Sequence, residues 1–415
     1  MNIKLRLKIL SFMELFVWGS YLTSLGKYCG ATLHFSGPEI GTIFTTLGIG
    51  SLIMPPLLGI VADKYINAEK VLGICHLFGA GFLVFAANVT GANEMFWVML
   101  AVAMCFMPTL ALSNSVSYSI LKQNNFDVIK VFPPIRVWGT IGFIVAMWIV
   151  DLLQWTMSNN QLYVGAISGV VMAIISFTMP KCPISKSSEN TTLFSRFGLD
   201  AFVLFKQRKM AVFFIFAMFL GAALQITNME GQDFLGDFGK IDEYKNSFGV
   251  NHTGILMSIS QISETLFILA IPFFLYKFGI KKVMLISMIA WVLRFGFFAI
   301  GNPGGGLFLL VLSMIIYGMA FDFFNISGSL FVEKETNPNI RSSAQGLFMM
   351  MTNGLGAIIG AKGCGFVVGY FTENGEKNWQ NIWFTFAAYA LILAILFPLI
   401  FKYDHKPENL ENSLH

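Results

Sequence analysis

Long apolar segments recur along the whole chain, and they limit its fold more than any other feature of the sequence. A helix needs about 20 apolar residues to cross roughly 30 Å of hydrocarbon. Only 12% of the residues are charged, whereas soluble domains carry about 25%. The segments long enough to cross are residues 9–29, 39–61, 71–90, 95–120, 135–153, 162–180, 210–229, 253–275, 282–300, 306–331, 343–371 and 381–401. The sequence therefore predicts an all-α membrane protein with twelve transmembrane helices.

The longest polar connection, residues 182–209, separates six apolar segments from the other six. We therefore expect an N-terminal six-helix bundle in residues 1–180 and a C-terminal six-helix bundle in residues 209–402. A cytoplasmic linker with an amphipathic segment, residues 181–208, would join them, and residues 403–415 would form a cytoplasmic tail.

The basic residues are distributed unevenly between the two sides of the predicted membrane. Of 27 Lys and Arg, 20 fall on the side that holds both termini, four on the other side and three within apolar segments. Cytoplasmic loops are enriched in Lys and Arg, so we expect both termini in the cytoplasm. The net charge of +4 then reflects topology and does not indicate nucleic-acid binding. We expect the first apolar segment to be a retained helix, because no small-residue cleavage site follows it.

Cysteine and histidine give no sign of a metal or redox site. The five cysteines and five histidines are scattered, without CxxC or metal-site spacing. No catalytic constellation and no phosphate-binding Gly-rich loop is present. We therefore expect neither an enzyme nor a cofactor.

Two loops occupy equivalent positions in the two halves. GIVADKY (59–65) follows the second segment and YKFGIKK (276–282) follows the eighth. Each resembles the loop signature of the major facilitator superfamily, although the second copy lacks the aspartate. Either match alone also fits ordinary cytoplasmic positive charge. Together with the six-plus-six organisation they favour two bundles around a midplane cavity.

An ionisable group at bilayer depth costs about 2.5–3.5 kcal/mol, so it usually faces a cavity or a partner. Six such residues stand inside apolar segments: Glu14, Arg136, Glu264, Arg294, Asp322 and Lys362. Glu14 and Arg294 also fit structural ion pairs, and Lys362 also fits packing or snorkelling. For His76 we expect a hydrogen-bonded position inside a bundle.

Several of these residues share a helical face with other polar or aromatic side chains. Arg136, Thr140 and Phe143 follow i, i+4, i+7 spacing, although Arg136 also fits an arginine that snorkels to the interface. The pairs Gln225/Asn228 and Gln261/Glu264 follow i, i+3 spacing, and their amides also fit helix packing. Tyr317, Phe321 and Asn325 form a stripe beside Asp322.

These segments resemble the bacterial nucleoside:proton symporters, the nucleoside and xanthosine permeases of the major facilitator superfamily. The likeness extends from the first helix to the final FKYDH. The segments that carry it are FPPIRVWGTIGFIVAMW, GLDAFVLFK, LQITN, SISQISETLFILAIPFF, YGMAFDFFNISGSLFVEKE and SAQGLFMMMTNG. The resemblance implies proton-driven nucleoside uptake across the inner membrane by a chain that works as a monomer in the lipid bilayer. It also implies a pocket made of Arg136, Thr140, Phe143, Gln225, Asn228, Gln261, Glu264, Tyr317 and Phe321.

Our hypothesis for coupling is that Asp322, with Glu264, carries the proton. Burial and an approaching Arg136 act in opposite directions on the proton affinity of a carboxylate, so a rocking motion between bundles would load and release the proton. One proton entering down 100 mV gains about 2.3 kcal/mol. Glu14 and Lys362 depart from what we expect of the family, and either would alter coupling or nucleoside preference.

Two other functions remain open at this point. Carboxylates and amides also suit another polyhydroxylated solute, such as an oligosaccharide, carried by the same proton-coupled fold. A non-transporting receptor or a passive facilitator would bind without uphill transport.

Overall fold

The computed structural model describes residues 2–184, 199–337 and 340–403. Its elements in chain order are α1 (Ile3–Gly19), α2 (Leu25–Lys27), the π-helix η1 (Tyr28–Thr32), α3 (Gly37–Lys64), α4 (Ala68–Ala86), α5 (Ala92–Gln123), α6 (Val128–Leu152), α7 (Asn160–Phe177), the 3-10 helix η2 (Leu199–Lys206), α9 (Arg208–Asp237), the 3-10 helix η3 (Phe238–Lys240), α10 (Phe248–Asn251), α11 (Thr253–Ile300), α12 (Leu307–Glu335), α13 (Arg341–Met349), the π-helix η5 (Met350–Gly356), α14 (Ala357–Tyr370), β1 (Thr372–Glu373), β2 (Glu376–Lys377) and α15 (Trp379–Ile400). The two strands form one short antiparallel hairpin.

The twelve expected crossings are confirmed. Within the described ranges, ten helical segments are long and apolar enough to cross a membrane. One of them, α11, contains 48 residues and two crossings, divided at Gly279 where φ is 76° and ψ is 165°. Glycine suits this position because side chains clash in that region of φ/ψ space. The 17-residue α1 supplies a further crossing.

Two boundaries differ from the expectation. The first apolar segment, residues 9–29, is broken: α1 ends at Gly19, and a turn leads to α2 and η1. The expected loop at residues 276–282 is helical except at Gly279. Of the loop signature GIVADKY, the side chains of Asp63 and Lys64 lie outside the described residues.

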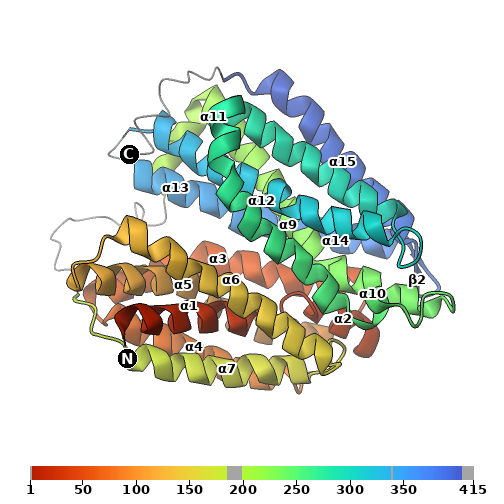
Figure 1. The fold of residues 1–415 in the computed structure, drawn as a ribbon, viewed down its shortest axis with the longest axis horizontal. Helices are drawn as coiled ribbons and strands as arrows, with labels where there is room; N and C mark the ends of the chain where they lie inside the picture. Colours follow the sequence, from red (N-terminus) through yellow and green to blue (C-terminus); the bar gives the residue numbers. More distant parts are fainter. Residues whose placement is uncertain (1, 185–198, 338–339, 404–415) are drawn as a thin grey trace.

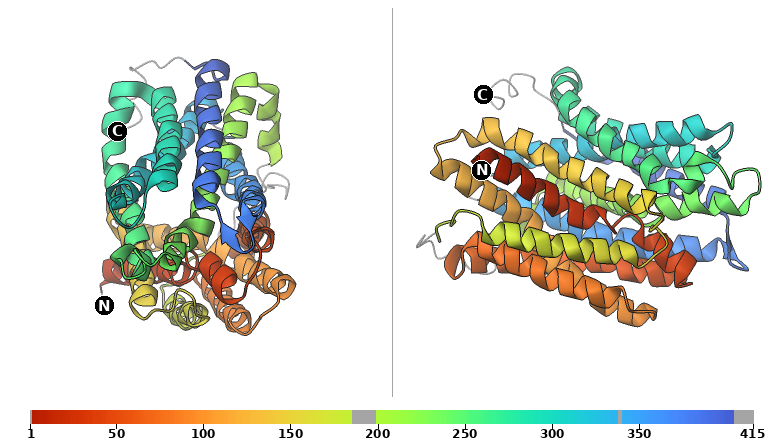
Figure 2. Two further views of the ribbon diagram at one scale, coloured as in Figure 1. Left: turned by 90° about the vertical axis from the view of Figure 1, so that its right-hand side faces the viewer. Right: turned by 60° about the horizontal axis from the view of Figure 1, so that its bottom comes forward.

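The helices are arranged as two bundles, α1–α7 and α9–α15, which lie against each other in Figures 1 and 2. The start of α1 and the end of α15 lie toward the same end of the molecule, opposite α2, α10 and the hairpin (Figure 1). Residues 185–198 of the expected linker and 404–415 of the expected tail fall outside the described residues, while the remaining part of the linker includes η2. The domain boundaries stay a prediction.

Each bundle has its own apolar interior, and in the C-terminal bundle much of it is aromatic. The ring of Phe213 in α9 lies 4.7 Å from that of Phe331 in α12 and 5.4 Å from that of Phe348 in α13. These contacts hold three helices of one bundle together without using the surface that faces the other bundle.

The bundles contact each other where small residues let their backbones approach. A Cβ on Gly41 of α3 would lie 2.5 Å from the Ala361 carbonyl oxygen of α14, and one on Gly48 would lie 2.6 Å from the Gly354 carbonyl oxygen. Small residues are favoured at such crossings because packing drives helix association in lipid. The interface also includes α6 against α11 and α2 against α9.

Candidate substrate and proton site

The central charged residues come from both bundles. Arg136 of α6 has an exposed side chain, and Glu264 of α11 has a partly exposed one. The guanidinium of Arg136 interacts electrostatically with the carboxylate of Glu264. Opposite charges of the two bundles are therefore near each other here, and neither side chain is fully buried.

Asp322 of α12 lies beside this pair and is buried. Its side chain is 3% exposed, and its carboxylate interacts electrostatically with that of Glu264. Among the described residues, Asp322 Oδ2 has no hydrogen-bond partner. Buried polar atoms are nearly always paired in native proteins, so this oxygen is an exception that a bound proton would satisfy.

Aromatic and amide side chains adjoin the acids. Tyr317 is buried, its hydroxyl interacts with the Gln261 amide, and its ring stacks on that of Phe321 at 6.0 Å with 12° between the planes. The guanidinium of Arg294 lies 4.5 Å from the centre of the Tyr317 ring. The stripe expected on α12 is therefore a packed aromatic wall with polar groups at its edge.

The other predicted pocket residues make few interactions with the charged and aromatic residues described above. Thr140 is partly exposed, while Phe143 is buried and contacts Trp18 of α1 edge-on at 6.3 Å. Gln225 of α9 is buried with its Nε2 unpartnered, and Asn228 is partly exposed. In the described part of the chain, neither amide makes a side-chain hydrogen bond to the other predicted residues. The nine residues stay a predicted pocket, in which the charges of Arg136 and Glu264 interact and the Tyr317 hydroxyl interacts with Gln261.

A small hollow adjoins the aromatic wall, and five polar or aromatic residues around it, Phe324 among them, were not among the nine. Phe321 lines it together with Trp291 of α11, Asn325 of α12 and Thr352 and Asn353 of η5. The sequence did indicate Asn325, because it continues the stripe of Tyr317 and Phe321 by one further helical turn. The sequence contained little indication of Asn353, because a single amide in an apolar segment does not show which way its side chain points.

The three other ionisable residues have separate partners. Glu14 accepts a hydrogen bond from Thr109 at 2.6 Å and pairs with His76 Nε2 at 2.9 Å. His76 therefore lies in a bundle interior, as expected. These contacts all lie within the N-terminal bundle.

Arg294 makes no ion pair with any carboxylate in the described ranges. It donates instead to the Ser313 carbonyl at 2.9 Å and to the Ser260 hydroxyl at 3.3 Å. Lys362 donates to Thr42 across the bundle interface at 2.7 Å. This hydrogen bond gives Lys362 a role in joining α14 to α3.

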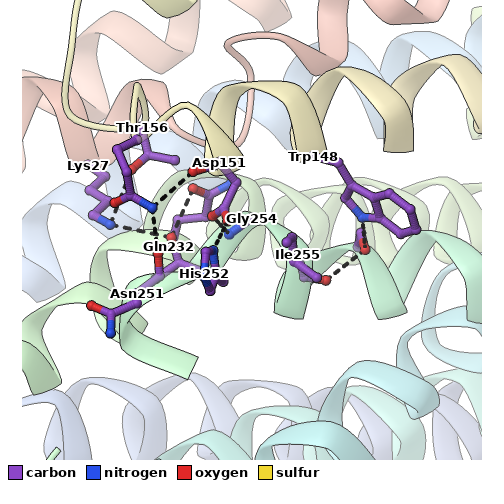
Figure 3. A network of polar contacts seen from close by, with 12 residues as sticks. Lys27, Trp148, Asp151, Thr156, Gln232, Asn251, His252, Gly254 and Ile255 are labelled. Atoms are coloured by element: carbon purple, nitrogen blue, oxygen red, sulfur yellow. Dashed lines mark hydrogen bonds and ion pairs between the residues drawn. The ribbon is translucent and has the colours of Figure 1, made fainter. Parts of the chain in front are cut away.

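A second polar cluster joins the bundles at the end away from the termini (Figure 3). Asp151 of α6 accepts from the Gly254 backbone N–H at 2.7 Å and contacts His252 Nδ1 at 2.8 Å. Lys27 lies 3.3 Å from the Thr253 hydroxyl, and Gln232 donates to Thr23 at 2.8 Å. We call this set the distal network: Thr23, Lys27, Asp151, Gln232, His252, Thr253 and Gly254. No sequence pattern predicts this network, because its members have the residue types and positions of ordinary loop or helix-end residues.

The hairpin carries a further ion pair at this end. Lys377 of β2 pairs with Asp233 of α9 and lies 3.9 Å from Glu230 Oε2. Burial lowers the pKa of Lys377, but the carboxylates of Glu230 and Asp233 more than offset it, so the pKa is raised above its usual range. Lys377 therefore stays charged at neutral pH and fixes the hairpin to α9.

Two helical bundles with ionisable groups facing each other across their interface define a secondary transporter of the major facilitator type. A family model described as "Nucleoside H+ symporter" matches residues 1–406. The chain belongs to this family, and it is a transporter, not an enzyme.

Three relatives are similar over nearly the whole chain. The xanthosine permease of Escherichia coli (strain K12) is 54% identical over 413 residues, covering 99% of both chains. The nucleoside permease NupG of the same organism is 54% identical over 406 residues, covering 98% of this chain and 97% of its own. A crystal structure of an aspartate-to-alanine variant of the nucleoside transporter NupG superposes with a TM-score of 0.95 at 53% identity, covering 97% of this chain and all of that one.

Proposed function

We propose that this chain carries nucleosides into a bacterium together with protons, by alternating access across the inner membrane, with both termini in the cytoplasm and as a monomer. Membership of the nucleoside H+ symporter family supports the cargo and the coupling ion. The excess of Lys and Arg on the side of the termini supports the orientation.

The nucleoside would bind among the nine predicted pocket residues. The single observation that carries this proposal is the electrostatic interaction between Arg136 of α6 and Glu264 of α11, because it brings opposite charges of both bundles near each other while neither side chain is fully buried. Tyr317 and Phe321 offer ring faces for a base, and base–aromatic stacking is worth about 1–3 kcal/mol. Gln261 and the carboxylates suit the hydroxyls of a ribose.

The coupling proton would reside on Asp322, assisted by Glu264. Asp322 Oδ2 lacks a partner in the described residues, and the nearest opposite charge to Glu264 belongs to the other bundle. When the bundles move apart at the site, the carboxylates lose that charge, and proton uptake and release would follow the movement.

The alternating movement would use the distal network as its outer closure. In the proposed orientation this network joins the bundles on the outer side, whereas Arg136 and Glu264 are exposed or partly exposed. The described conformation would then give the site access to the cytoplasm.

Uptake into energised membrane vesicles tests the proposal. Labelled uridine, adenosine and xanthosine should accumulate above the outside concentration, and a protonophore should abolish the accumulation. Excess unlabelled nucleoside should compete, whereas sucrose or another oligosaccharide should not. Protonophore-resistant uptake, or competition by sugars alone, would contradict the proposal.

A further inference from the structure

The hollow beside the predicted pocket contains two carboxamides that the protein leaves free to bind something else. It has a volume of about 20 Å³, enough for one water-sized group. Asn325 of α12 and Asn353 of η5 both line it. Asn353 Nδ2 reaches only the Met349 sulfur, at 3.9 Å, and within the described residues no hydrogen bond engages the Asn325 side chain.

The other polar group of the hollow is already engaged. The Thr352 hydroxyl donates to the Phe348 carbonyl of its own helix at 3.0 Å. The two carboxamides are therefore the side chains of the hollow that can both donate to and accept from a bound group without giving up a hydrogen bond to a protein oxygen or nitrogen among the described residues, while Trp291 can offer its indole N–H as a donor. Asn325 is partly exposed and Asn353 is exposed, so neither amide is confined to the packed interior.

The backbone around Asn353 is irregular in a way that fits a binding position. Residues Met350–Gly356 form a π-helix between α13 and α14. π-helical turns inside α-helices occur frequently at functional sites. Here the π-helix places Thr352 and Asn353 together on the wall of the hollow.

The hollow is continuous with the aromatic wall of the predicted pocket. Phe321 belongs to both, and its ring stacks on that of Tyr317. Trp291, which lines the hollow, contacts Tyr317 edge-on at 6.1 Å with 90° between the planes. A flat base resting against Phe321 would thus have its rim near the two carboxamides.

We propose that Asn325 and Asn353 form a base-edge subsite, in which the hollow accepts the exocyclic group of the nucleoside base and the two carboxamides hydrogen-bond to that group and its ring neighbour. A carboxamide presents one donor side and one acceptor side, the pattern that pairs with adenine through its amino group and ring nitrogen. The group in the hollow is the amino group or carbonyl oxygen at the 6-position of a purine or the 4-position of a pyrimidine. This inference rests on the proposed function, because it assigns part of the same nucleoside site.

Ligands that differ by this one group test the inference in the wild-type protein. Binding of adenosine is compared with binding of purine riboside, which lacks the 6-amino group, by calorimetry on the purified transporter. We expect adenosine to bind about tenfold more tightly, the size of one good base contact. Equal binding of the two by the wild-type protein would overturn the subsite. Failure of both to bind would count against nucleoside transport itself.

Two variants test whether Asn325 and Asn353 are the residues that distinguish adenosine from purine riboside. In Asn325→Leu and Asn353→Leu we expect adenosine to lose more affinity than purine riboside, which keeps the ring nitrogen, so that the tenfold ratio between the two ligands falls to within about twofold. Asn325→Asp removes the donor, so it should bind adenosine but lose affinity for inosine, which presents a carbonyl oxygen. Asn381→Leu, the same change at an exposed position of α15, should keep the wild-type ratio. If either leucine variant weakens both ligands equally, or keeps the ratio, the assignment of that residue is wrong.

Discussion

Two buried acids, one in each bundle, differ in how their oxygens are satisfied. Glu14 and Asp322 are both 3% exposed. Both oxygens of Glu14 are engaged, by Thr109 and by His76, whereas Asp322 Oδ2 has no partner among the described residues. A carboxylate with fixed partners stabilises a bundle, while one with an open oxygen can take up a proton during transport.

The surroundings of the two acids differ in a second way. The partners of Glu14 come from α4 and α5 of its own bundle, so rocking of the bundles leaves them in place. Asp322 instead neighbours Glu264, whose opposite charge, Arg136, belongs to the other bundle. Only the second environment changes with the conformation, which is the requirement for coupling a proton to movement.

The largest expected effect on stability comes from removing Glu14. Glu14→Leu leaves His76 and Thr109 without their partner, and breaking a buried pair costs about 3–5 kcal/mol. The melting temperature of the purified protein should fall clearly. Asp322→Asn removes no protein partner of Oδ2, so its melting temperature should stay near that of the wild type. An equal fall in melting temperature in the two variants would contradict the difference described between Glu14 and Asp322.

The next effect concerns substrate affinity. Arg136→Gln removes the charged donor that the predicted pocket offers to the nucleoside, and a hydrogen bond to a charged group is worth about 1.5–3 kcal/mol. Nucleoside binding measured by calorimetry should weaken by at least about tenfold. Lys8→Gln, which removes a cation 5.6 Å from the Trp138 ring at the end of the bundle near the termini, is the matched control and should bind normally.

A smaller effect is expected at the distal network. Asp151→Asn weakens its charge-assisted contacts with His252 and the Gly254 N–H, which are worth about 1.5–3 kcal/mol each. The population open at this end should increase, and spin-label distances between the distal ends of α6 and α11 should show a longer component. Asn88→Ala, which alters a hydrogen bond inside the N-terminal bundle, should leave the distances unchanged. An unaltered distribution in Asp151→Asn would mean that the network does not hold the bundles together.

The smallest effect is expected at Lys362. Its hydrogen bond to Thr42 crosses the interface, but the lysine is exposed, so Lys362→Met should change stability by no more than about 1 kcal/mol. Initial uptake rates should change less than threefold. A loss of proton coupling in this variant would give Lys362 a role that its single hydrogen bond does not explain.

The sequence predicted the crossings well because an apolar segment of about 20 residues has few alternatives. It also indicated Arg136, Glu264 and Asp322 as candidates, since charge at bilayer depth is rare, and their roles stay predictions. It did not predict that α1 breaks at Gly19 or that residues 276–282 stay largely helical, because local turns depend on packing. The distal network and the position of Asn353 were missed for the same reason: Asp151 meets a backbone N–H more than a hundred residues away, and spacing along one helix carries no information about such a contact.

The most direct test compares Asp322→Asn with Glu14→Gln in energised vesicles, using the same change from acid to amide in each bundle. Asp322→Asn should lose protonophore-sensitive accumulation of nucleoside while it still exchanges labelled for unlabelled nucleoside across the membrane. Glu14→Gln should keep both activities. Continued uphill, protonophore-sensitive accumulation by Asp322→Asn would contradict the assignment of the coupling proton to Asp322.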